Sequence, residues 1–222
     1  MTHVVLLGDS IFDNGGYVPE GCEVATQLRR CLGDAHKVTL GARDGSVLAD
    51  MPAQCAAVAA LREPPSHLVI SCGGNDVLGL VGAMQTPVAS VLDAAEMLAA
   101  WQADFRRDYR AMLQQVQACG MPFAVCTIYD AVPNLSPGLR SALALFNDVI
   151  LREAVIHAIP VLDLRLVCAH AGDYSAVSPI EPSSEGGRKI GAAIAELVLA
   201  DEGDVVRTVV FGASALRPGS AG

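Results

Sequence analysis

Short runs of apolar residues alternate along this chain with longer segments of helical periodicity. The expected strands are near-continuous apolar runs without a period of two, and they span 3–8, 37–41, 67–73, 122–128 and 160–165. The expected helices lie between them, near 20–32, 48–61, 89–119, 137–157 and 183–200. Uninterrupted apolar strands are typical of a parallel sheet covered on both faces. The pattern predicts an α/β fold with a doubly wound sheet and right-handed crossovers.

The length of 222 residues suits one such domain. We expect the domain to occupy residues 1–200 and a C-terminal extension to occupy 201–222, with an edge strand at 205–211. Hydrophobic residues make up 52% of the chain, which is enough to bury a sizeable core and argues against disorder.

The net charge and the cysteines limit which binding partners and which cellular compartment we expect for this protein. A net charge of −9 repels phosphate backbones and anionic lipid, so we expect neither nucleic acid nor a membrane as partner. The N-terminus lacks the basic region of a signal peptide, and no apolar stretch has the length of a membrane span. The 7 cysteines contain no C-x-x-C pair, which favours free thiols in a reducing compartment over disulfides or zinc. We therefore expect a cytoplasmic protein.

Polar and small residues gather in the loops that follow the expected strands. These loops are "GDSIFDNGG" at 8–16, "GARDGS" at 41–46, "GGND" at 73–76, and a segment that contains His170, Asp173 and "SPIEPSSEGGRKIG". In an open parallel sheet, ligands bind outside the carboxyl ends of the strands, where these loops meet. Each loop taken alone is equally compatible with an ordinary turn.

Taken together, three of these residues suggest acyl-transfer chemistry. Ser10 can present its hydroxyl and its backbone N–H to a substrate carbonyl, and Gly45 allows a second backbone N–H to approach closely. Asn75 can add a side-chain amide donor. Converging donors of this kind stabilise an oxyanion. The first loop lacks the G-x-G-x-x-G spacing, the P-loop lysine and the G-x-S-x-G elbow, so dinucleotide, phosphate and α/β-hydrolase interpretations are disfavoured.

The ordered set of four blocks resembles the SGNH (GDSL-type) hydrolases. It comprises Gly8-Asp9-Ser10, Gly45, Gly73-Gly74-Asn75-Asp76 and "IEPSSEGGRKI", and it spans 8–187. The resemblance implies a flavodoxin-like three-layer α/β/α sandwich with a five-stranded parallel sheet. It implies hydrolysis of a small-molecule ester or thioester, or acyl transfer, with no metal or other cofactor. Ser10 would be the nucleophile, and its N–H, Gly45 and Asn75 would form the oxyanion hole.

The last block departs from the family pattern at both proton-handling positions. Alignment on Pro182-Ser183 puts Glu181 where the family has its catalytic histidine and Ser178 where it has the supporting aspartate. A serine hydroxyl is a poor nucleophile without an adjacent base. The runner-up hypothesis is therefore a pseudo-hydrolase that keeps the pocket and binds a ligand or a partner. A flavodoxin-like nucleotide binder rests on fold analogy alone.

Two residues are candidates for the missing base. Glu181 is the first, if burial raises its pKa, although it could instead satisfy the first-turn amides of the helix that begins near Ser183. His170 is the second, because it is the one histidine that follows a strand. The others fall at or just before strand starts, at the edge opposite Ser10: His3, His36, His67 and His157.

The acids around these blocks have structural interpretations. We expect Asp9 to hold the turn through backbone hydrogen bonds, and Asp13-Asn14-Gly15 to be an ordinary turn. Asp76 is expected to cap the following segment.

Overall fold

The computed structural model describes residues 1–200, so the expected extension at 201–222 and its edge strand at 205–211 lie outside the described residues. Five parallel strands form one sheet in the order β2-β1-β3-β4-β5. The strands are β1 (His3–Gly8), β2 (Lys37–Leu40), β3 (His67–Ser71), β4 (Phe123–Cys126) and β5 (Val161–Leu162). This order and orientation confirm the predicted doubly wound fold.

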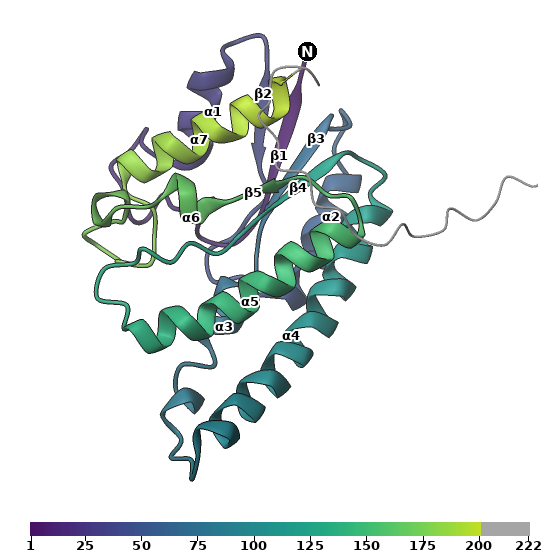
Figure 1. The fold of residues 1–222 in the computed structure, drawn as a ribbon. Helices are drawn as coiled ribbons and strands as arrows, with labels where there is room; N and C mark the ends of the chain where they lie inside the picture. The colour runs from purple at the N-terminus through teal and green to yellow at the C-terminus, as the bar shows by residue number, and fades with distance from the viewer. Residues whose placement is uncertain (201–222) are drawn as a thin grey trace, which may run out of the picture.

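Helices cover both faces of the sheet, as Figure 1 shows. On one face, α1 (Val24–Leu32) packs against α7 (Ser184–Leu199), and α6 (Leu164–Val167) lies beside them. On the other face lie α2 (Met51–Ala59), α4 (Val91–Ala118) and α5 (Pro137–Ile156). Short helical segments complete the connections: η1 (Leu48–Asp50), α3 (Gly74–Leu78), η2 (Ala83–Gln85) and η3 (Ala171–Asp173). Each face has its own apolar core, so the molecule is a three-layer α/β/α sandwich.

The last strand is shorter than the sequence predicted. The expected strand at 160–165 contributes only Val161 and Leu162 to the sheet. Asp163 caps α6 directly afterwards, where its side chain accepts a hydrogen bond from the Arg165 N–H. This cap starts a helix inside the segment that was expected to continue the strand. The long expected helices are confirmed to within a few residues of their ends, except that the segment 20–23 precedes α1.

Two other observations concern membrane-spanning segments and the state of the cysteines. No helix within residues 1–200 has both the length and the apolarity that crossing a membrane requires. All seven cysteines lie in this range and are free thiols, and four of them are buried.

Candidate active site

The turn that carries Ser10 begins with a close backbone approach at the end of β1. Gly8 has a φ of +122°, and a Cβ at this position would lie 1.7 Å from the Ser71 carbonyl oxygen. Gln54 of α2 fixes the same residue, because its Oε1 accepts from the Gly8 N–H and its Nε2 donates to the Gly8 carbonyl, both at 2.8 Å. The position immediately before the Asp9-Ser10 pair therefore requires glycine.

Asp9 stabilises the turn as the sequence predicted. Its Oδ1 accepts a hydrogen bond of 3.1 Å from the Ile11 N–H, and its carbonyl accepts from the N–H groups of Phe12 and Asp13. Ser10 is nearly buried, with 6% of its surface exposed. Ser10 nevertheless lines a cavity at the carboxyl end of the sheet.

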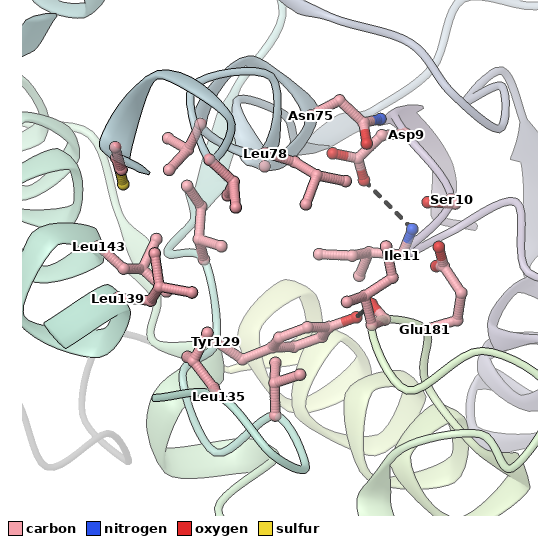
Figure 2. A pocket seen from close by; sticks show the side chains of 17 residues that line it. Asp9, Ser10, Ile11, Asn75, Leu78, Tyr129, Leu135, Leu139, Leu143 and Glu181 are labelled. Atoms are coloured by element: carbon pink, nitrogen blue, oxygen red, sulfur yellow. Dashed lines mark hydrogen bonds between the residues drawn. The ribbon is translucent and has the colours of Figure 1, made fainter. Parts of the chain in front are cut away.

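Figure 2 shows this cavity, which has a volume of about 130 Å³. Polar groups line it at one end, where Ser10, Asp9, Asn75 and Glu181 meet. The remaining wall is almost entirely apolar and comes from the segments after β1 and β3, from the segment that runs from the end of β4 into α5, and from the loop before α7: Ile11, Gly74, Val77, Leu78, Val81, Met84, Ile128, Tyr129, Val132, Leu135, Leu139, Leu143 and Ile180. The arrangement can hold an apolar chain with its polar head at Ser10.

The two expected oxyanion donors differ in how they are placed. Asn75 lines the cavity, and its Nδ2 donates one hydrogen bond of 2.9 Å to the Ser46 carbonyl, which leaves its second N–H for a ligand. Gly45 has a φ of +77° and lines a neighbouring, more polar cavity rather than this one. The prediction that Asp76 caps the next segment is wrong, because Asp76 lies inside α3 and its carboxylate accepts from the Leu48 N–H at 3.1 Å.

Glu181 faces Ser10 across the polar end of the cavity (Figure 2). Its segment is held through main-chain atoms on both sides. The Tyr129 hydroxyl donates to the Ile180 carbonyl at 2.5 Å, and Asn14 donates from Nδ2 to the Pro182 carbonyl at 3.3 Å. The Glu181 carbonyl accepts from the Ser175 N–H at 2.8 Å. The position of residue 181 is therefore fixed independently of its side chain.

Glu181 is buried, with 4% of its residue surface exposed. Its Oε2 has no hydrogen-bond partner within residues 1–200. Burial raises its pKa to about 7, and the neighbouring Ser10 hydroxyl offsets part of this rise by hydrogen bonding. Glu181 does not cap α7. Ser183 does so, accepting from the Gly186 N–H at 3.1 Å. The structural alternative for Glu181 is therefore wrong.

Ser178, which was aligned by sequence with the family's aspartate, accepts a hydrogen bond of 3.1 Å from the Glu181 N–H through its carbonyl. His170 is exposed at the start of η3 and does not line the cavity. His3 and His67 lie at the first residues of β1 and β3, at the amino ends of the strands, as predicted. His36 immediately precedes β2, and His157 follows the end of α5.

Asp9 is a second buried carboxyl group at the polar end of the cavity. It is 2% exposed, and its burial raises its pKa to about 8, with the charge of Glu181 adding to the effect and the Ile11 N–H opposing it. At neutral pH Asp9 is therefore largely protonated, which lowers the cost of placing Glu181 as an anion in the same cavity.

Three residues that support the site were not given a supporting role by the sequence analysis. The prediction of an ordinary turn at Asp13-Asn14-Gly15 is wrong for Asn14, which is fully buried and also accepts from the Val24 N–H at 2.9 Å. Tyr129 carried no signal beyond its place after a strand. Gln54 is the one amide in the apolar run "MPAQCAAVA", and a lone amide in such a helix was the available signal.

Comparison with known proteins identifies the family. The family profile described as "GDSL-like Lipase/Acylhydrolase family" matches residues 6–189. No curated protein matches the chain significantly. The chain therefore belongs to the GDSL-like lipase/acylhydrolase family, whose members are esterase-like hydrolases.

Solved structures share the fold at low sequence identity. An acetyl xylan esterase, AlAXEase, is 17% identical with a TM-score of 0.67, over 89% of this chain and 100% of its own. A G-D-S-L family lipolytic protein from Veillonella parvula is 17% identical with a TM-score of 0.65, over 90% and 98%. The inhibitor-bound aryl esterase of M. smegmatis is 16% identical with a TM-score of 0.64, over 89% and 98%.

Proposed function

We propose that this protein is a serine esterase, thioesterase or acyltransferase in which Glu181 takes the role of general base. The observation that carries the proposal is the buried carboxyl group of Glu181, which faces Ser10 and has an unpartnered oxygen. A general base works best when its pKa lies near the operating pH. The pKa of about 7 that burial gives Glu181 meets this condition.

The proposed reaction has two half-reactions. In the first, the Ser10 oxygen attacks the substrate carbonyl and Glu181 accepts the hydroxyl proton. The oxyanion that forms is held by the Ser10 N–H and by Asn75, whereas Gly45 lines the neighbouring cavity and is given no role in this step. Collapse of this intermediate expels the alcohol or thiol, which takes the proton from Glu181. In the second, water or an acceptor alcohol attacks the acyl-serine, and Glu181 accepts and then returns a proton to Ser10.

The test measures p-nitrophenyl acetate hydrolysis and labelling by a fluorophosphonate. Ser10→Ala is expected to abolish both. Glu181→Gln keeps the shape of the side chain and is expected to lower kcat by at least about 100-fold. Glu185→Gln, which removes an exposed carboxylate in the first turn of α7, is the matched control and should leave kcat unchanged. His170→Ala should also leave kcat unchanged, and a loss there equal to that of Glu181→Gln would contradict the choice of base.

The second candidate function is a binding module without turnover. Two observations on residues 1–200 favour it: no imidazole from this part of the chain lines the cavity, and none of its carboxylates forms a hydrogen bond with Glu181. A protein that is neither labelled nor active at Ser10, but that binds neutral ester analogues in the cavity, would establish this alternative.

A further inference from the structure

A groove, lined by both apolar and polar residues, adjoins the cavity that contains Ser10. It has a volume of about 320 Å³ and runs between η2, the first half of α4 and the start of α5. Figure 1 shows this half of α4 projecting past the body of the sandwich. Met84 and Leu139 line both the cavity and the groove, so these two side chains stand between the two spaces.

The cavity on the Ser10 side of this wall is small. An apolar cavity of about 150 Å³ accommodates benzene, which has six carbon atoms. The present cavity, at about 130 Å³, therefore fits an apolar chain of similar size. The groove behind the wall is more than twice as large, but a chain that starts at Ser10 reaches it only past Met84 and Leu139.

Met84 is the adjustable part of the wall. Its backbone is fixed, because its N–H donates to the Leu80 carbonyl at 3.0 Å. Its side chain is half-buried and unbranched, so it can change rotamer more readily than a branched side chain. Leu139 belongs to the first turns of α5 and closes the wall from the other side.

We propose that Met84 and Leu139 set the acyl-chain length of the substrate, by ending the acyl cavity after about six carbons and separating it from the groove. The proposal rests on the proposed function, since it concerns the acyl group that Ser10 would receive. It makes the preferred substrate an ester or thioester of a short apolar acid, rather than an acetyl ester or a long-chain lipid.

The test is the chain-length profile of p-nitrophenyl esters from acetyl to dodecanoyl. In the wild type, kcat/KM is expected to rise by about fourfold per methylene up to hexanoyl, because each CH₂ is transferred into the apolar cavity, and to fall beyond it. Met84→Ala joins the two spaces and should move the optimum to about decanoyl, and Leu139→Ala should move it in the same direction. Met97→Ala is the matched control, because Met97 lines the groove and not the cavity. Its profile should equal that of the wild type.

A binding measurement separates failure of this inference from failure of the proposed function. Calorimetric titration of Ser10→Ala with a homologous series of methyl ketones requires no turnover. A length limit near six carbons that Met84→Ala removes would support the wall even in a protein without esterase activity. Ser10-dependent turnover with a flat profile, or the same optimum in wild type and Met84→Ala, would overturn the inference and leave the proposed function intact.

Discussion

At the scale of single residues, the site combines two carboxyl groups whose environments give them different roles. Asp9 accepts a hydrogen bond from the Ile11 N–H through one oxygen and is buried next to Ser10. Glu181 keeps a free oxygen and faces Ser10. Burial raises the pKa of both, to about 8 for Asp9 and about 7 for Glu181. What distinguishes the two groups is geometry, because Glu181 has the unpartnered oxygen and faces Ser10.

This assignment predicts the pH dependence of the reaction. A carboxyl group with a raised pKa is protonated, and inactive as a base, below that pKa. We therefore expect kcat/KM of the wild type to increase tenfold per pH unit below about pH 6 and to level off above about pH 7. In Glu181→Gln the residual rate should not show this rise, whereas Asp9→Asn should keep it. A rise that survives in Glu181→Gln would assign the base to another group.

At the scale of elements, the segment between η3 and α7 acts as a frame for residue 181. Tyr174 pairs with Pro182 in an isolated antiparallel bridge, and Tyr129 packs edge to face against Tyr174 with ring centroids 4.9 Å apart. Tyr129 donates to the Ile180 carbonyl, while Tyr174 donates to the Cys168 carbonyl at 2.9 Å. The two hydroxyls therefore support different parts of the same region.

Removing each hydroxyl in turn tests the frame. Tyr129→Phe releases the residue next to Glu181, lets water reach the carboxyl group, and lowers its pKa. We expect kcat to fall by about fivefold, from a loss of positioning that costs about 1 kcal/mol, and the rise in the pH profile to move to lower pH. Tyr174→Phe removes a comparable hydrogen bond and should leave the pH profile in place. Identical pH profiles for both variants would contradict a positioning role for Tyr129.

The sequence predicted the elements better than the contacts between them. Continuous apolar runs identified all five strands, and the rule that ligands bind at carboxyl ends brought Ser10, Asn75 and Glu181 to one cavity. It did not predict that Asn14 would be buried, because Asn in a glycine-rich stretch also fits an exposed turn. It did not reveal the apolar cavity either, since its wall is assembled from four segments distant in the chain.

At the scale of the whole molecule, the buried acids link stability to pH. In the unfolded chain Asp9 titrates near pH 4, but in the folded protein it does so near 8. The folded state therefore holds a proton that the unfolded state releases throughout this interval. Glu181 contributes in the same direction between its ordinary value and about 7. The free energy of unfolding is thus expected to decrease as pH rises from 5 to 8 on account of these two groups.

Asp9→Asn tests this linkage, because asparagine keeps the oxygen that accepts from Ile11 but carries no titratable proton. We expect the variant to gain stability relative to the wild type with rising pH, by at most about 1.4 kcal/mol per pH unit. Urea unfolding at several pH values between 5 and 8 measures the difference. The comparison cancels the effect of His3 and His67, whose pKa values burial lowers. Parallel stability curves for the two proteins would contradict the linkage.

The hydrogen bonds around residue 181 end on the carbonyls of Ile180, Glu181 and Pro182. None of these three bonds depends on which side chain residue 181 carries. An imidazole or an amide at this position would inherit the same backbone placement opposite Ser10. We therefore expect a substitution at residue 181 to leave the surrounding loop in place. The backbone around residue 181 sets where its side chain lies, and the side chain sets only which chemistry is available there.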